Sequence, residues 1–286
     1  MKIGVSSYSY QRLLNQGKTY FEICDHAKKT GFDAIEFTDL NTQNGKGETT
    51  QEDLAVSIRE YCEKIGLEIT AYTIGADLLN GRGCAPAEEP ERLMGKLDIA
   101  ALLGAKIMRH DVFWSMAGFK DWRGAVDKIV PAIREVSDYA AEKGIRTCTE
   151  NHGLIMQDSE RLVYLMRAVD HANYGWLVDM GNFLCADEAP QHAVGIAAPW
   201  AVHVHAKDFL FKSGEQEKPE GGWLTTRGGN YLRGTVAGHG VVPVRACVNI
   251  LKAAGYQGTL SLEFEGMEEN LPAIEAGCAY LRKLAQ

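Results

Sequence analysis

The amino-acid sequence predicts a (β/α)8 TIM barrel that forms a single domain over residues 1–286. The main observation is a recurring pattern of a helical stretch, a glycine and a short apolar segment, centred on Gly31, Gly66, Gly104, Gly144 and Gly255. A glycine just past a helix end takes the left-handed cap conformation at little cost. Because helices and short apolar strands alternate, the sheet is expected to be parallel.

The number of these units and the length of the chain support the same fold class. Strands are expected near residues 2–8, 32–38, 67–74, 105–111, 145–150, 174–179, 201–208 and 258–264. Helices are expected near residues 18–30, 50–65, 88–103, 121–142, 157–170, 188–198, 242–254 and 270–284. Eight such units in 286 residues match a TIM barrel. A doubly wound open sheet is the alternative, but no GxGxxG motif follows the first strand.

One stretch, residues 208–241, does not fit the repeating unit. It contains eight glycines, and we expect it to be irregular. A loop of this length in a compact domain is typical of a lid or a binding loop, and an oligomer contact is the alternative. Side chains suited to contact a ligand occur along it, namely Trp223, Arg227, Tyr231, Arg233 and His239. We therefore expect Trp223, Arg233 and His239 to bind substrate.

Composition and charge exclude several classes of partner. The net charge is −8 and no run of like charges occurs, which argues against nucleic acid or an anionic membrane as the partner. The N-terminal residues lack the apolar core of a signal peptide, and the most apolar window, residues 193–206, is too short to span a bilayer. The seven cysteines form no CxxC pair and are odd in number. We expect reduced thiols in a cytoplasmic protein.

Four residues that could hold one metal ion lie near the ends of four expected strands: Glu150, Asp179, His205 and Glu263. The C-terminal ends of barrel strands meet at one mouth, so these side chains are expected to converge. Three carboxylates and an imidazole suit one divalent ion such as Mn, Mg, Co or Zn. A structural salt bridge for Glu150 and a loop cap for Asp179 are the alternatives.

Two of these positions have a close competitor on the same strand face. His203 and His205 alternate with Lys207, and His205 lies nearer the C-terminal end, so His203 is expected to be a hydrogen-bonded core residue. Glu263 directly follows the apolar run, whereas Glu265 adjoins the Gly266 turn. Lys207 is expected to touch substrate or to pair with the neighbouring Asp208.

Other side chains near strand ends are candidates for the same mouth. Glu36 could bind substrate hydroxyls or a network on the helix side, and Arg109 could bind a phosphate or an acidic partner. No glycine-rich phosphate cradle is evident, which favours an unphosphorylated substrate. His110 and the aromatic residues Tyr8, Tyr10, Phe113 and Trp114 could complete the lining, with ordinary packing as the alternative.

Five segments carry a resemblance to a known family: GFDAIEF (31–37), TEN (149–151), VDMGN (178–182), HVHAKD (203–208) and GYQGTLSLEFEG (255–266). With them the chain resembles the xylose-isomerase-like TIM barrels, the sugar phosphate isomerase/epimerase superfamily. The resemblance implies a metal ligand set of Glu150, Asp179, His205 and Glu263. It further implies a ketose isomerase or epimerase that acts through an enediolate, with Glu150 and Glu263 as acid and base.

Two departures from the pattern of that family keep an alternative open. Many epimerases carry a histidine where this chain has Asn182, and His152, two residues after Glu150, is another candidate base. Some relatives act as lyases on 3-keto-sugars or 3-keto-glycosides with the same enolate chemistry. The expected partner is a small carbohydrate. A homo-oligomer is a further expectation, since related barrels form dimers or tetramers.

Overall fold

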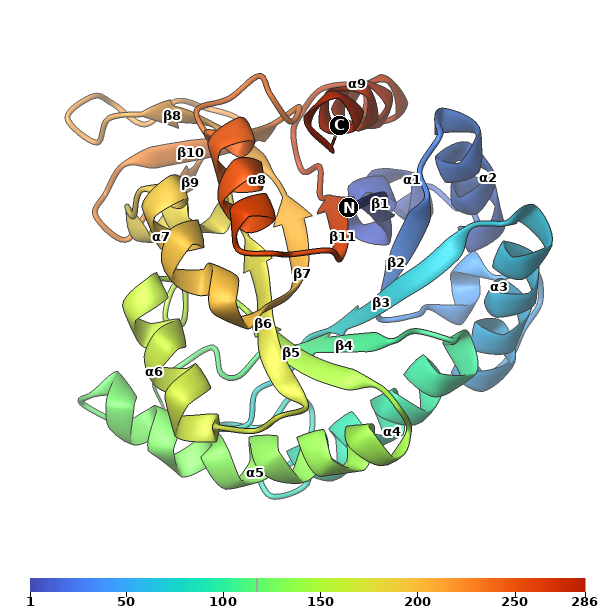
Figure 1. Ribbon diagram of the computed structural model, residues 1–286, viewed down its shortest axis with the longest axis horizontal. Helices are drawn as coiled ribbons and strands as arrows, with labels where there is room; N and C mark the ends of the chain where they lie inside the picture. Colours follow the sequence, from blue (N-terminus) through green and yellow to red (C-terminus); the bar gives the residue numbers. More distant parts are fainter. Residues whose placement is uncertain (117, 286) are drawn as a thin grey trace.

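In the computed structural model, which describes residues 1–116 and 118–285, eight parallel strands close into a barrel (Figure 1). Around the ring the strands follow the order β1-β11-β7-β6-β5-β4-β3-β2. Their bounds are β1 Lys2–Ser6, β2 Ala34–Thr38, β3 Glu68–Ile74, β4 Ile107–His110, β5 Arg146–Glu150, β6 Tyr174–Asp179, β7 Ala201–Ala206 and β11 Thr259–Leu262. The predicted (β/α)8 barrel, a single domain, is confirmed.

Helices cover the outside of the barrel (Figure 1). Their bounds are α1 Gln11–Asn15, α2 Tyr20–Thr30, α3 Gln51–Ile65, α4 Glu89–Leu103, α5 Trp122–Glu142, α6 Ser159–Val169, α7 Pro190–Ala197, α8 Val244–Ala253 and α9 Asn270–Ala285. The glycine caps occur as predicted: Gly31, Gly66 and Gly104 end α2, α3 and α4 in the left-handed conformation. The short helix α1 was not predicted.

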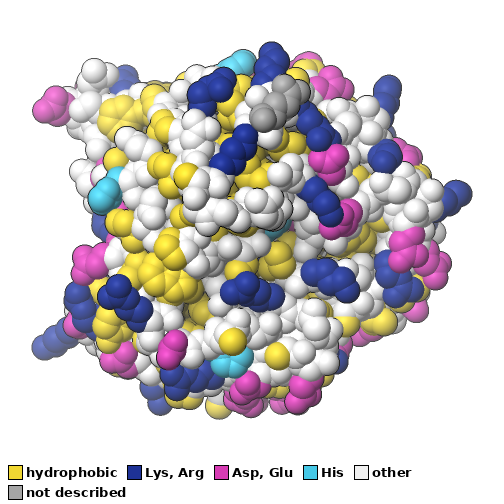
Figure 2. Space-filling model, in the orientation of Figure 1, with side chains coloured by type: hydrophobic (Ala, Val, Ile, Leu, Met, Phe, Trp, Pro, Cys, Tyr) yellow, Lys and Arg dark blue, Asp and Glu magenta, His cyan; other side chains and the backbone are white. Residues whose placement is uncertain are grey.

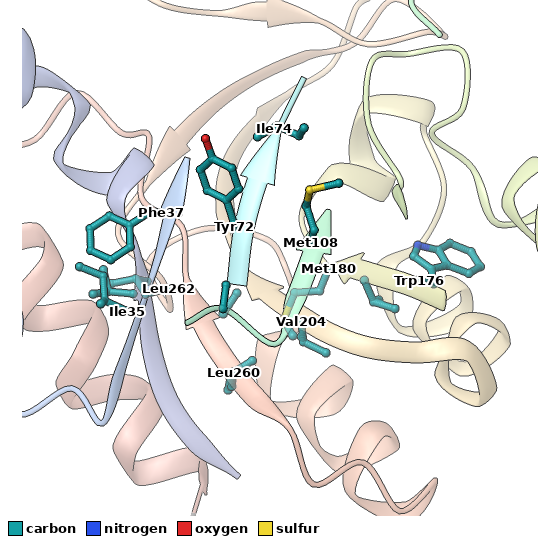
Figure 3. Packing of buried hydrophobic residues seen from close by; sticks show 14 of the residues in the cluster. Ile35, Phe37, Tyr72, Ile74, Met108, Trp176, Met180, Val204, Leu260 and Leu262 are labelled. Atoms are coloured by element: carbon teal, nitrogen blue, oxygen red, sulfur yellow. The ribbon is translucent and has the colours of Figure 1, made fainter. Parts of the chain in front are cut away.

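Alternation along each strand separates the apolar core from the interior of the barrel. On β2, Ile35 and Phe37 are fully buried in the apolar layer between strands and helices, where the Phe37 ring meets Tyr20 of α2 edge-on at 5.7 Å (Figure 3). Glu36 lies between them and points to the opposite side of the strand, into the barrel. The alternation therefore delivers polar side chains to the barrel interior while the helices cover the apolar face.

The prediction that residues 208–241 are irregular is wrong. They contain three short antiparallel strands, β8 Asp208–Lys212, β9 Leu224–Thr225 and β10 Tyr231–Thr235, in the order β8-β10-β9. Strand β8 pairs with β10 along its whole length, and its outer edge receives a hydrogen bond from the Val241 N–H to the Phe209 carbonyl (2.8 Å). It lies beside the barrel, at the upper left of Figure 1. Strand β7 accordingly ends at Ala206, and not at residue 208.

The glycine-rich turn that follows β10 is built around one carboxylate. Asp208 accepts hydrogen bonds from the backbone N–H groups of Gly238 (2.8 Å), Gly240 (2.9 Å) and Val242 (3.0 Å). A Cβ atom on Gly240 would lie 2.2 Å from Asp208 Oδ1, which explains the glycine at that position. The expected pairing of Lys207 with Asp208 does not form, because these backbone donors occupy the Asp208 carboxylate.

On the face seen in Figure 2, acidic and basic side chains are interspersed, and neither kind forms one large patch. Among the helices of the described residues, none combines the length and the apolar character needed to cross a bilayer.

Candidate metal centre and active-site cavity

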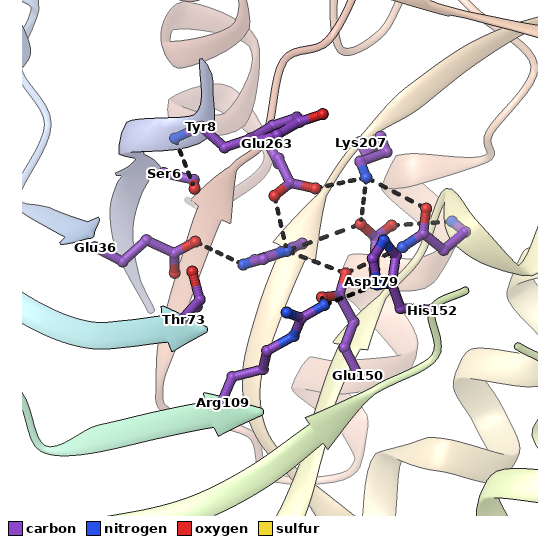
Figure 4. Close-up of polar contacts among 12 residues, drawn as sticks. Ser6, Tyr8, Glu36, Thr73, Arg109, Glu150, His152, Asp179, Lys207 and Glu263 are labelled. Atoms are coloured by element: carbon purple, nitrogen blue, oxygen red, sulfur yellow. Dashed lines mark hydrogen bonds and ion pairs between the residues drawn. The ribbon is translucent and has the colours of Figure 1, made fainter. Parts of the chain in front are cut away.

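The four predicted metal ligands converge at the C-terminal mouth of the barrel (Figure 4). Glu150 and Asp179 end β5 and β6, His205 lies near the end of β7, and Glu263 directly follows β11. His205 Nδ1 lies 3.5 Å from Glu150 Oε1, 3.8 Å from Asp179 Oδ2 and 3.6 Å from Glu263 Oε1. One ligand atom from each residue lies within 4.8 Å of all the others.

These distances and the unused atoms fit a divalent ion. Two ligands of one ion at about 2.2 Å each lie at most about 4.4 Å apart, so a small contraction brings the four atoms into coordination range. Among the described residues, buried His205 Nδ1 has no hydrogen-bond partner, and buried Asp179 Oδ2 has no hydrogen bond but an ion pair with Lys207 Nζ at 3.2 Å. An incompletely satisfied buried polar atom is costly unless a ligand occupies the space beside it. The residues present therefore fit a metal of the type that carboxylates and imidazole bind.

The electrostatics of Asp179 also favour a cation. Burial, together with the charges of Glu150 and Glu263, raises the pKa of Asp179 to about 7 although Lys207 is close by. The other Asp179 oxygen, Oδ1, accepts the backbone N–H groups of Gly181 (2.8 Å) and Asn182 (3.0 Å). These bonds fix the carboxylate so that Oδ2 faces the cluster.

Glu36 lies behind His205 rather than in the cavity. Its side chain is fully buried, and Oε1 lies 2.7 Å from His205 Nε2, outside the angle of a regular hydrogen bond. Its other oxygen, Oε2, is hydrogen-bonded to His203 Nε2, and His203 is a buried core residue as predicted. Neither predicted role of Glu36 is observed: it does not line the cavity, and its network lies inside the barrel with the two histidines and not on the helix side. The carboxylate of Glu36 orients the imidazole so that Nδ1 points at the ligand cluster.

Two cationic side chains hold the glutamates in place. Lys207 Nζ lies 2.5 Å from Glu263 Oε2 and 3.2 Å from Asp179 Oδ2. Arg109 Nη2 lies 2.6 Å from Glu150 Oε2. Burial raises the pKa of Glu150, but the charge of Arg109 and the contacts with His205 outweigh burial and lower that pKa to about 2. Both cations are therefore paired with carboxylates of the site.

Asn182, where many epimerases carry a histidine, links the two halves of the site. Its Nδ2 donates to Glu150 Oε1 (3.0 Å), and its Oδ1 accepts from Lys207 Nζ (3.2 Å). The amide thus bridges an acidic and a basic side chain, a role that needs both a donor and an acceptor at once.

His152 lies beside the ligand cluster and lines the cavity. Its Nδ1 is 3.0 Å from Asp111 Oδ1, and the ring meets Trp114 edge-on at 5.0 Å. Burial lowers the pKa of His152, but the hydrogen bond to Asp111 and the Asp111 charge raise it above the ordinary histidine value overall. The sequence analysis missed Asp111. The available signal was its position directly after β4, at the C-terminal end of a predicted strand.

The cavity itself measures about 480 Å³, and its wall combines the site with aromatic and loop residues. Tyr8 and Trp114 line it, together with Glu265, whereas Tyr10 and Phe113 are buried in the apolar core. His110 does not line it. Arg109 and His110 are neighbours on β4 and point to opposite faces, so His110 is buried outside the barrel interior, with its ring centre 6.0 Å from that of Tyr174.

The three substrate contacts expected from residues 208–241 are not brought to this cavity. Arg233 stacks over the Trp223 ring at 5.2 Å, so these two side chains contact each other within the added sheet. His239 is exposed in the turn around Asp208. Neither the sheet nor its turns cover the metal centre as a lid.

Comparison with known proteins places the chain among relatives of known fold. The xylose isomerase-like TIM barrel family matches residues 24–284. The inosose dehydratase of Geobacillus thermodenitrificans is 28% identical over 163 residues, which cover 56% of this chain and 52% of that protein. The chain thus matches about half the length of this curated relative.

Two solved structures share the architecture at low sequence identity. The structure of L-ribulose 3-epimerase superimposes with a TM-score of 0.73 at 16% identity, covering 99% of this chain and 94% of that one. A xylose isomerase-like TIM barrel protein from Mycobacterium smegmatis in complex with magnesium gives a TM-score of 0.72 at 17% identity, covering 99% and 96%. Since the family match spans nearly the whole chain, this protein belongs to the xylose isomerase-like TIM barrel family.

Proposed function

We propose that the chain is a divalent-metal-dependent enzyme that removes a proton from the carbon beside the carbonyl of an unphosphorylated keto-sugar or keto-polyol. The observation that carries the proposal is the convergence of Glu150, Asp179, His205 and Glu263, in which two buried ligand atoms, Asp179 Oδ2 and His205 Nδ1, make no hydrogen bond with the described residues. A magnesium-bound neighbour with the same fold supports the choice of a hard or borderline ion of the Mn, Mg, Co or Zn type. When bound, such an ion would supply positive charge to the substrate oxygen that becomes negative as the proton leaves.

Of the two reactions open to the resulting enolate, elimination of water fits the side chains best. Glu150 and Glu263 belong to the ligand cluster and are each paired with a cation. His152 stands outside the cluster, lines the cavity and is oriented by Asp111. An elimination needs only one base beside the metal centre, and His152 can be that base. The curated relative is named inosose dehydratase, which is also a lyase by its name.

In the proposed elimination His152 removes the proton from carbon in the first step and gives it to the leaving hydroxyl in the second. When Nδ1 carries the hydrogen and donates to Asp111, Nε2 takes the proton from the carbon beside the carbonyl. Arg109 Nη2, which also lies 3.0 Å from Nδ1, then donates to Asp111 and Glu150 and not to His152. The electron pair of that C–H bond forms the enolate. The hydroxyl on the next carbon then leaves with its bonding pair and takes the proton back from His152, so that one water is released and a double bond forms. No oxidant or second substrate is required.

The remaining polar residues position these groups. Arg109 and Lys207 hold the two glutamates, and Asn182 bridges between them. Both of these cations are paired with carboxylates, so neither offers a free charge to a phosphate group. Arg82 also lines the cavity and forms no ion pair with a described residue, so it is the cation there that a charged substrate would meet.

Epimerisation is the second candidate, and a specific observation favours it. Glu150 and Glu263 lie 3.5 Å and 3.6 Å from the same His205 nitrogen and come from different strands, so they could flank one carbon. One would then remove the proton and the other would return one to the opposite face. L-Ribulose 3-epimerase shares the fold.

Product analysis with matched variants separates the two reactions. The purified protein with Mn²⁺ is given inososes and free ketoses, and the products are identified by mass spectrometry and NMR. Elimination predicts products that have lost water, and a fall in kcat of about 10²–10⁴-fold in His152→Gln. His171→Gln is the control, because His171 also pairs with an aspartate, Asp138, but on the outer surface. Products of unchanged mass, with full activity in His152→Gln, would instead establish the epimerase.

A further inference from the structure

The turn that carries His152 is held in an unfavourable backbone conformation. After β5 the chain reverses, and Leu154 has a φ of 65°, a left-handed conformation that a leucine rarely adopts. Local bonds support the turn: the His152 N–H donates to the Met156 carbonyl (3.0 Å), and the Leu154 N–H donates to Gln157 Oε1 (2.6 Å). Such a conformation persists only where the surroundings hold it.

A side chain from the added sheet supplies further support from outside the barrel. Arg227, in the turn between β9 and β10, donates from Nη2 to the Leu154 carbonyl (2.5 Å) and to the Ile155 carbonyl (3.3 Å). Its Nη1 donates to Asp158 Oδ2 (2.6 Å), and Asp158 caps the N-terminus of α6. The planar guanidinium therefore joins both ends of the strained turn at once.

The turn that presents Arg227 is itself fixed to the barrel. Asp187 accepts hydrogen bonds from Thr226 Oγ1 (2.7 Å) and Asn230 Nδ2 (2.8 Å). A Cβ atom on Gly228 would lie 2.8 Å from Asp187 Oδ2, so the turn packs closely on that carboxylate. The backbone N–H of Arg227 donates to the Cys185 carbonyl (2.9 Å). The guanidinium is thus placed by a well-anchored turn and not by a free loop.

We propose that Arg227 is a positioning residue for His152, and that the β8–β10–β9 sheet braces the His152 turn. The inference rests on the proposed role of His152 in the reaction. Without Arg227, Leu154 loses the bond to its carbonyl and the turn relaxes, while Arg161 still contacts the Ile155 carbonyl (2.6 Å) from α6. The imidazole then spends less time beside Asp111 and the metal centre. A displacement of about 1 Å is enough to cost roughly 10²-fold in rate.

The test combines local hydrogen exchange with kinetics in Arg227→Ala and the milder Arg227→Lys. Amide exchange is measured by mass spectrometry on the peptide that contains residues 152–158. Turnover is measured with an inosose, and with the free ketoses where the inosose is not turned over. Arg123→Ala is the control: Arg123 is partly exposed and pairs with Glu160 of α6, but contacts none of the turn carbonyls.

The expected result for Arg227→Ala is exchange in residues 152–158 about tenfold faster or more, with kcat reduced by about 10–10²-fold. KM and the Mn²⁺ affinity stay within about twofold of the original enzyme, because the ligand cluster is untouched. Arg227→Lys has one ammonium group in place of the forked guanidinium. Its exchange rate and kcat are expected to lie between those of the original enzyme and those of Arg227→Ala. If Arg227→Ala does not fold, the lysine variant gives the same readouts.

Two outcomes would overturn the inference. Unchanged exchange in residues 152–158 would show that Arg227 does not brace the turn. Faster exchange with unchanged kcat, in an enzyme that His152→Gln inactivates, would show that the brace does not position His152. Full activity of His152→Gln would instead refute the proposed function, and the brace would then be judged by the exchange data alone.

Discussion

Replacement of Glu36 by glutamine is expected to weaken metal binding although Glu36 is not one of the four candidate ligands and does not line the cavity. The carboxylate is fully buried and contacts the Nε2 atoms of both His203 and His205. Glutamine offers only one acceptor oxygen, so its NH₂ group would face one of the two imidazoles. Loss of the negative charge also makes His205 Nδ1 a weaker ligand.

The size of the effect follows from the place of Glu36 in the site. Removal of a partner that orients a metal-bound histidine costs about 10–100-fold in metal affinity, which corresponds to about 1.4–2.7 kcal/mol. We expect the upper part of this range, because one carboxylate serves two buried imidazoles.

The assay is titration of Mn²⁺ against a competing chelator at neutral pH, with thermal unfolding of the metal-free protein measured in parallel. Glu68→Gln is the control, because Glu68 is about half exposed, starts β3 at the opposite end of the barrel and pairs with Lys2. An Mn²⁺ affinity of Glu36→Gln within about twofold of the original, in a protein that still folds, would refute the orienting role.

Three further predictions follow from the same geometry. Mn²⁺ affinity should fall by at least about tenfold per pH unit below pH 7, because the metal must displace the proton that Asp179 binds at its raised pKa of about 7 and also the proton of His205, whose pKa burial lowers but Glu36 and Glu263 raise well above the ordinary histidine value overall; a titration series from acidic to neutral pH measures this. Asp111→Asn should lower kcat by about 10²-fold and shift the acidic limb of the pH–rate profile downward, since Asp111 raises the pKa of His152. Gly240→Ala should lower the free energy of unfolding by about 2–3 kcal/mol in chemical denaturation, because its Cβ would lie 2.2 Å from Asp208 Oδ1.

Each of these has an outcome that contradicts it. An affinity that is flat between acidic and neutral pH would mean that Asp179 is not a ligand, and an unchanged pH profile in Asp111→Asn would separate Asp111 from the base. Gly195→Ala is the control for the glycine prediction. Gly195 lies in α7 with open space around its added Cβ, so the change should be neutral or stabilise by up to about 1 kcal/mol. Equal effects of the two alanine variants would refute the packing argument.

The barrel and the convergence of the four candidate metal ligands were predictable because both depend on local pattern. The glycine-capped helix before Glu150 and the apolar run before Asp179 mark strands, and the C-terminal ends of parallel strands meet at one mouth. Helix ends at Gly31 and Gly66 were visible for the same reason, since a glycine cap is a feature of neighbouring residues.

What the sequence did not show depends on contacts between distant residues. Strand β10 pairs with β8 across a long glycine-rich connection, and the short alternating segments involved are indistinguishable from loop until the pairing is known. Asp111 and His152 are 41 residues apart and meet only at the closed mouth. The sequence shows that Arg227 has a side chain suited to hydrogen bonding. Nothing in its neighbouring residues indicates that its partners are the carbonyls of Leu154 and Ile155.

The most direct test of the central claim is deuterium uptake followed by NMR. The protein is incubated in heavy water with inososes and free ketoses, with added Mn²⁺ or with a chelator in its place. We expect deuterium beside the carbonyl, in remaining substrate or in product, only when Mn²⁺ is present, and none with Glu150→Gln. Turnover that proceeds equally in chelator, or product that keeps the hydrogen originally bound to that carbon, would contradict metal-dependent proton abstraction as the chemistry of this site.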